Sequence, residues 1–158
     1  MTTKTDFSDE EWARIVRAPF VAGLAISLAD PGGPIEATKE TMATLKSATN
    51  PPSREQLLTD VALEIQAMTQ QKQNPLKGYK PASQPAGEAV LEELREVKAL
   101  VAAKATPEET AAFGAWLVTS AQAAADAAKE GGFMGFKAQL VSEGEQSMLD
   151  RIREAVGD

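Results

Sequence analysis

Apolar residues recur at intervals of three and four along two long segments of the chain, from Asp9 to about Ala29 and from Arg54 to about Gln71. That spacing places them on one face of a helix. In the first segment they are Trp12, Ile15, Val16, Phe20, Leu24 and Leu28, and in the second Leu57, Leu58, Val61, Ile65 and Met68. Two amphipathic helices are therefore predicted, and we expect Pro19 to kink or split the first of them.

Four further segments complete the predicted helices. They run from Ile35 to about Ala48, Glu88 to about Lys104, Glu108 to about Lys129, and Glu143 to Val156. The segment from Glu108 holds Phe113 and Trp116 and then many alanines, whose small side chains allow close helix approach. We expect this helix and the first one to lie near the centre of the fold.

Four predicted helix starts carry a hydroxyl residue with Glu or Gln three positions later, the pattern of a capping box. The pairs are Ser8/Glu11, Ser53/Gln56, Thr106/Glu109 and Ser142/Glu145. Together with the periodicity they predict an all-α fold: one domain over residues 1–158, a bundle of five to six helices.

Two parts of the chain share a layout of helix, glycine pair and helix, and they are predicted to form helical hairpins over residues 8–50 and 106–157. Residue identity between them is poor. A true duplication and two similar hairpins of independent origin both remain open.

Between the hairpins, residues 70–87 are rich in Gln, Lys, Pro and Ser, which predicts a mobile linker. It holds the single tyrosine, Tyr79, among Lys72, Lys77 and Lys80. One hypothesis makes Tyr79 part of a docking segment for a protein partner. The alternatives are a solvated linker and a segment that rests on its own domain.

Composition excludes several classes of binding partner and of chemistry. The formal net charge of −7 disfavours nucleic acid and anionic membrane surfaces as partners. Cysteine and histidine are both absent, which removes thiolate chemistry, the usual triad base and the commonest zinc ligand. The N-terminal residues 1–6 lack the apolar core of a signal peptide, so we expect a cytoplasmic protein. The uncharged runs at 18–29 and 111–125 are shorter than the about 20 residues of a membrane span, so we expect no span.

Acidic residues surround the turn after the first helix. Asp30 precedes the turn, and Glu36 and Glu40 share one face of the following helix. Three convergent carboxylates would hold a hard cation such as Ca²⁺ or Mg²⁺. The simpler interpretation is that acidic residues in a first helical turn stabilise the helix through its dipole.

The same turn resembles a known family. The run from Ala29 through Asp30, Gly32 and Gly33 to Glu36, followed by Glu40, is similar to the Ala-Asp-Gly turn and helical glutamate of tellurite-resistance TerB-like domains. In this chain Pro31 separates the aspartate from the glycines, and residues 140–145 resemble the helix-opening part of the pattern. The resemblance implies an all-α module of two related halves whose acidic loops bind metal.

A second candidate site is the glycine-flanked run of Phe133, Met134 and Phe136. Such a loop either folds back and plugs the core, contacts a partner protein, or anchors shallowly in a membrane, and the acidic charge makes the last the poorest choice. Burying each side chain contributes about 1.5–3 kcal/mol, which favours the plug.

No catalytic motif is present. The adjacent pairs Glu10/Glu11, Glu92/Glu93 and Glu108/Glu109 point in different directions and are predicted to be solvated. We therefore expect a non-enzymatic protein without cofactors that acts by binding another protein. A homodimer is one form of this hypothesis, because Val90, Leu94, Val97 and Val101 make a narrow seam suited to helix packing.

Overall fold

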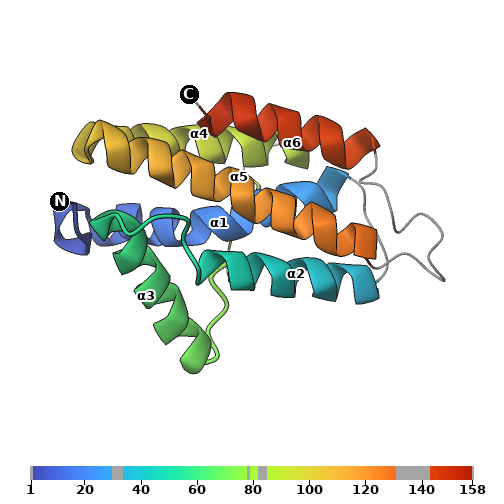
Figure 1. Cartoon of the computed structure of the whole chain (residues 1–158), viewed down its shortest axis with the longest axis horizontal. Helices are drawn as coiled ribbons and strands as arrows, with labels where there is room; N and C mark the ends of the chain where they lie inside the picture. Colours follow the sequence, from blue (N-terminus) through green and yellow to red (C-terminus); the bar gives the residue numbers. More distant parts are fainter. Residues whose placement is uncertain (1, 30–33, 78, 82–84, 131–142, 158) are drawn as a thin grey trace.

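The computed structural model describes residues 2–29, 34–77, 79–81, 85–130 and 143–157, without the side chains of residues 34–37 and 128–130. These residues form an all-helical bundle and contain no strand, which confirms the predicted fold class (Figure 1). The elements are a 3₁₀ helix η1 (Lys4–Asp6), α1 (Asp9–Ala29), α2 (Pro34–Ala48), α3 (Gln56–Gln70), α4 (Ala86–Lys104), α5 (Pro107–Glu130) and α6 (Glu143–Val156).

The helices α1 and α5 lie at the centre of the bundle, as predicted. Each of them contacts every other α-helix (Figure 1). The largest fully buried side chains include Ile15 and Ile26 of α1 and Phe113, Trp116 and Leu117 of α5. One apolar interior therefore joins these two helices to α2, α3, α4 and α6.

Pro19 does not split α1, which continues as one helix of 21 residues. Residues 18–23 are all buried, so this part of the helix is surrounded by protein on every side. Packing on all faces stabilises the helix there and offsets the backbone hydrogen bond that the proline removes. Of the two predicted outcomes, a kink or a split, the split is therefore excluded.

The helix α1 is long and apolar enough to cross a membrane, alone among the helices in the described part of the chain. The uncharged run at 18–29 is shorter than a membrane span, but the whole of α1, with its 21 residues, is long and apolar enough for one. Within the bundle, 61% of its most apolar window is buried against other helices. Core helices of water-soluble proteins have the same character, so α1 by itself is weak evidence for a span.

Two of the predicted capping boxes are present. Ser8 and Glu11 exchange hydrogen bonds of 2.8 and 3.1 Å, and Thr106 and Glu109 exchange bonds of 3.2 and 3.1 Å. The pair at Ser142 lies outside the described residues. Each of the two observed boxes satisfies two backbone N–H groups at the start of a helix, which is why α1 and α5 begin where the sequence indicates.

The predicted capping box at Ser53 was wrong. The helix α3 begins at Gln56, its N-cap is Glu55, and the buried Ser53 Oγ has no hydrogen-bond partner among the described residues. The carboxylate of Glu109 on α5 instead accepts a bond of 3.3 Å from the Leu57 backbone N–H. A carboxylate distant in the sequence therefore accepts the backbone hydrogen bond that a local N-cap side chain would otherwise accept.

Glu109 joins three parts of the fold, and we call this cluster the Glu109 joint. Its carboxylate is 2% exposed and accepts hydrogen bonds from the Thr2 backbone and hydroxyl, the Leu57 backbone and the Thr106 backbone. Burial acts to raise the pKa of Glu109, but these four bonds outweigh it and lower the pKa to about 2. The expectation that Glu109 is solvated was therefore wrong.

The narrow seam on α4 packs inside the chain. Val90, Leu94, Val97 and Val101 are all 0% exposed, and α4 contacts α1, α5 and α6. The seam does pack on other helices, as its spacing predicts, but those helices belong to the same chain. The four seam side chains are therefore covered within the chain, and a homodimer stays a prediction.

Candidate functional site

The three predicted metal ligands are described only in part. Asp30 and the side chain of Glu36 lie outside the described residues. Glu40 is 2% exposed, and its carboxylate accepts a hydrogen bond from the Ser27 hydroxyl of α1. Beside Glu40 is a cavity of about 60 Å³ that Thr41 and Thr44 also line. Within the described residues no three acidic side chains form a cluster that would hold a metal ion.

Of the predicted partner-binding residues, Phe133, Met134 and Phe136 lie outside the described part of the chain, and Tyr79 lies within it. Tyr79 is half-buried against the core, and the Arg17 guanidinium lies 5.5 Å from the centre of its ring. Burial, followed by the nearby charge of Glu93, raises the pKa of Tyr79. Leu76 and Tyr79 of the linker therefore rest on their own domain, in line with one of the alternatives above.

Backbone hydrogen bonds order the chain directly after α3. The Gln73 N–H donates to the Met68 carbonyl and the Lys72 N–H to the Thr69 carbonyl, the two bonds of a Schellman motif. Lys72 occupies the left-handed position of this motif with φ of 58°, where glycine is the usual residue. The segment that was predicted to be mobile thus begins with a defined turn that fixes the direction of Lys72.

This turn forms one wall of a groove of about 660 Å³, which we call the lysine-rimmed groove. Its other walls are η1, α1 and α3, and its apolar lining includes Trp12, Val16 and Met68. Six of its thirteen lining residues are charged: Lys4, Asp9, Arg17, Glu64, Lys72 and Lys77. Four of these six are basic, in a chain whose net charge is −7.

Only part of this charge is neutralised inside the groove. The Lys4 ammonium lies 2.9 Å from the Glu64 carboxylate, which also accepts a hydrogen bond of 3.1 Å from the Trp12 indole N–H. The Lys4 bond, followed by the Trp12 bond, lowers the pKa of Glu64. No described carboxylate lies within ion-pair distance of Lys72 or Lys77. The basic linker in the sequence was the signal for this site, but its apolar floor was not predicted.

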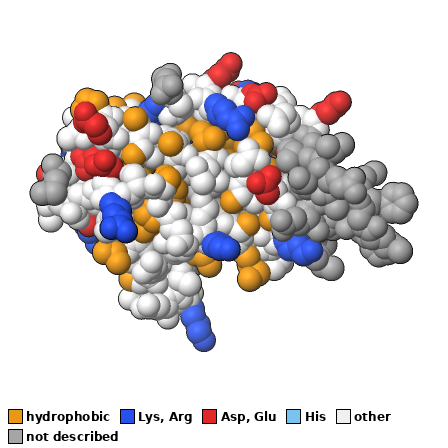
Figure 2. Space-filling model, viewed as in Figure 1, with side chains coloured by type: hydrophobic (Ala, Val, Ile, Leu, Met, Phe, Trp, Pro, Cys, Tyr) orange, Lys and Arg blue, Asp and Glu red, His pale blue; other side chains and the backbone are white. Residues whose placement is uncertain are grey.

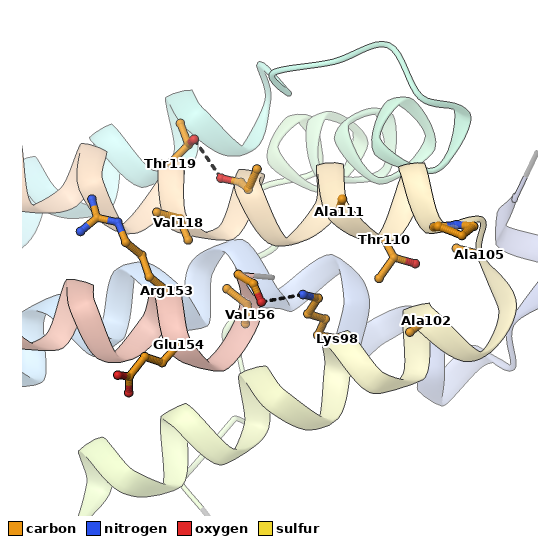
Figure 3. A pocket seen from close by; sticks show the side chains of 13 residues that line it. Lys98, Ala102, Ala105, Thr110, Ala111, Val118, Thr119, Arg153, Glu154 and Val156 are labelled. Carbon is orange, nitrogen blue, oxygen red and sulfur yellow. Dashed lines mark hydrogen bonds between the residues drawn. The ribbon is translucent and has the colours of Figure 1, made fainter.

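A larger groove of about 940 Å³ lies between α4, α5 and the C-terminal end of α6 (Figure 3). We call it the α4–α5 groove. Ten of its thirteen lining residues are uncharged, and most of these are alanine, threonine or valine. Ala102, Ala111 and Ala115 are exposed within it, whereas Val156 is buried at its floor.

The groove exists because α6 is shorter than the helices it covers. The helix α6 has 14 residues, whereas α4 has 19 and α5 has 24, and both extend past the end of α6 (Figure 1). At this end α6 approaches α5 so closely that a Cβ on Gly114 would collide with the Val156 carbonyl. From Pro107 to Gly114, about 12 Å of α5 extends past the end of α6.

Two basic side chains flank the α4–α5 groove. The Lys98 ammonium donates a 3.0 Å hydrogen bond to the Gly157 carbonyl (Figure 3). Arg153 donates a 3.3 Å bond to the Gln122 side chain of α5. On the face in Figure 2, hydrophobic side chains reach the surface between scattered acidic and basic ones. The lining of the α4–α5 groove itself is mainly uncharged, and its charged residues are Lys98, Arg153 and Glu154.

The chain gave no match when compared with protein-family models, curated proteins and solved structures.

The sequence did not predict the α4–α5 groove. Its alanines were interpreted as small residues that allow close helix packing, which holds for the buried Ala121, Ala124 and Ala125. Ala111 and Ala115 are four residues apart and are both exposed, and this spacing was the available signal.

Proposed function

We propose that this chain is a non-enzymatic, cytoplasmic helical module that acts by binding another protein, and that an amphipathic helix of the partner occupies the α4–α5 groove. The observation that carries the proposal is the stretch of α4 and α5 beyond the end of α6, where exposed alanines line a trough. A partner helix placed there would continue the line of α6.

The lining of the groove suits a helix. Small side chains let a second backbone approach closely, and a partner helix would remove the apolar surface of Ala102, Ala111 and Ala115 from water. Lys98 has no ion pair with a described carboxylate, so an acidic residue at one end of the partner helix would meet an available positive charge. Recognition would thus combine an apolar face with a terminal carboxylate.

Photo-crosslinking followed by peptide binding tests this proposal. A benzoylphenylalanine is placed at the position of Ala115, and in a control chain at the position of Met42, which is 66% exposed on α2. The partner segment that crosslinks from position 115 alone is synthesised as a peptide. We expect this peptide to become helical on binding and to bind Ala115→Glu at least tenfold more weakly, because the substitution puts a charge on the groove floor.

The control for charge is Met42→Glu, which should bind the peptide with unchanged affinity. Equal affinity of the peptide for Ala115→Glu and the unmodified chain would contradict the proposal. Crosslinks of equal strength from positions 115 and 42 would contradict it as well, because they would indicate contact without a site.

Cation binding by a TerB-like module is the second candidate. It is supported by the buried Glu40 carboxylate beside a small cavity that hydroxyl-bearing residues line, since hard cations prefer oxygen ligands. Calorimetric titration with Ca²⁺, Mg²⁺ and Mn²⁺ tests it, with Glu40→Gln as the variant and the exposed Glu154→Gln as its control. Absence of heat, together with a melting temperature unchanged by millimolar metal, would exclude this candidate.

A further inference from the structure

We propose that the lysine-rimmed groove binds a small amphipathic anion, an organic carboxylate or phosphate monoester with an apolar tail. This site is separate from the α4–α5 groove. It is built from η1, α1, α3 and the turn after α3, none of which lines the other groove. The inference therefore does not depend on the partner-helix proposal.

The shape of the groove fits a small molecule. Its volume of about 660 Å³ lies within the range of about 300–1,000 Å³ that is typical of ligand pockets. Trp12 and Val16 are each 4% exposed and form its floor, and the partly buried Met68 packs against the same core. An aliphatic or aromatic tail would therefore find an apolar surface, which Met68 can adjust to different shapes.

The charge of the groove selects an anion. Lys72 and Lys77 are exposed on the same wall and have no carboxylate partner among the described residues. Arg17 is also without a described carboxylate partner, and it is directed by the Pro75 carbonyl and the Tyr79 ring. Three positive charges at the rim of an apolar floor, on an acidic protein, would attract a ligand with an anionic head.

The backbone at Lys72 supports the same conclusion. A lysine in the left-handed conformation is strained, and glycine at this position would relieve the strain. The strained position directs a basic residue to the rim of the groove. An exposed acidic peptide would also be attracted to these lysines, but it would leave the apolar floor unfilled, so the floor favours a compact ligand with a tail.

Isothermal titration calorimetry with four eight-carbon ligands tests the inference. The ligands are octanoate, octyl phosphate, 1-octanol and octylammonium, each below the concentration at which it aggregates. We expect both anions to bind at least tenfold more tightly than octanol, and octylammonium to bind most weakly. The ratio between octanoate and octyl phosphate then identifies which anionic head the groove prefers.

A charge-matched pair of variants assigns the binding to this groove. Lys72→Gln with Lys77→Gln should weaken octyl phosphate binding about tenfold or more. Lys39→Gln with Lys46→Gln on α2 makes the same change in net charge at exposed positions outside the groove and should leave binding unchanged. Thermal melting of both variants shows whether each remains folded.

Four results would overturn the inference. Three of them are equal binding of octanol and the octyl anions, equal weakening by the two double variants, and no heat and no melting shift with either anion. The fourth comes from a titration with hexaglutamate, an acidic peptide without an apolar tail, and is tighter binding of hexaglutamate than of octyl phosphate. The last result would replace the small anion with an acidic peptide as the occupant.

Discussion

The two grooves of this bundle arise in different ways and have opposite chemistry. The α4–α5 groove is a gap where one helix ends early, and ten of its thirteen lining residues are uncharged. The lysine-rimmed groove is a gap that a basic turn encloses, and six of its thirteen lining residues are charged. A groove between helices is lined by the small, uncharged residues of the helix faces. A groove beside a connecting segment is lined in part by that segment and is polar where the segment is polar.

One structural feature is common to both grooves. The Glu109 joint accepts hydrogen bonds at the start of α3, a wall of the lysine-rimmed groove, and at the start of α5, a wall of the α4–α5 groove. Variants at this joint should therefore affect both grooves together, whereas variants at either groove should affect only that groove.

The largest effect is expected from Glu109→Gln. Because the pKa of Glu109 is about 2 in the folded chain against an ordinary value of 4.5, its carboxylate contributes about 3 kcal/mol to the free energy of unfolding at neutral pH. That contribution is complete above about pH 4.5 and is lost as the pH falls toward 2. Urea unfolding between pH 2 and 7 should show the loss in the variant at neutral pH and its convergence with the original chain in acid.

The exposed neighbour provides the control for this prediction. Glu108→Gln changes the same charge one residue away and should alter the free energy of unfolding by less than about 1 kcal/mol. If Glu109→Gln and Glu108→Gln lose equal stability at neutral pH, the joint does not have the role assigned to it.

Gly114→Ala should affect the α4–α5 groove alone. The new Cβ would collide with the Val156 carbonyl, a backbone atom that moves only if the end of α6 moves. We expect a loss of about 1–3 kcal/mol in the free energy of unfolding and weaker partner-helix binding. At Gly87 a Cβ would meet only the flexible end of Met148, at 3.3 Å, so Gly87→Ala should be nearly neutral. Denaturant titration compares the two, and equal losses would contradict the close approach of α5 and α6.

Lys72→Gly should affect the lysine-rimmed groove alone, with opposite effects on stability and binding. Relief of the left-handed backbone should raise the free energy of unfolding by up to about 1 kcal/mol, while loss of the ammonium weakens octyl phosphate binding. Thermal melting and calorimetry measure the two effects. A variant that loses stability but keeps its affinity would contradict the role of Lys72.

The smallest effect is expected from Ser53→Ala, outside both grooves. Its buried hydroxyl has no hydrogen-bond partner among the described residues, so removing it should change the free energy of unfolding by no more than about 0.5 kcal/mol. Thr106→Ala removes the N-cap hydroxyl that accepts the Glu109 N–H bond, and should lower the free energy of unfolding by about 1 kcal/mol. Chemical denaturation of both variants checks this difference, and a larger loss at Ser53 would show that it caps α3 after all.

The sequence predicts features whose partners are local. Apolar spacing identifies the helices, and Ser8 and Thr106 cap α1 and α5 because each meets a glutamate three residues away. It does not predict features that depend on distant partners. Glu109 was taken for a solvated residue because Thr2, which is 107 residues away, is a principal donor to it. The α4–α5 groove was missed for the same reason, since it depends on where α6 ends along α5.

The most direct test of the contrast between the grooves is an ¹⁵N NMR titration of the chain with octyl phosphate. We predict that the Trp12 indole signal and the amide signals of Lys72 and Gln73 shift with a single binding curve, while the Ala111 and Ala115 amides stay in place. The indole of the fully buried Trp116, which donates to the Ser47 carbonyl at 2.9 Å, is the internal reference. Equal shifts at Ala111 and Ala115, or an unmoved Trp12 indole, would contradict the account.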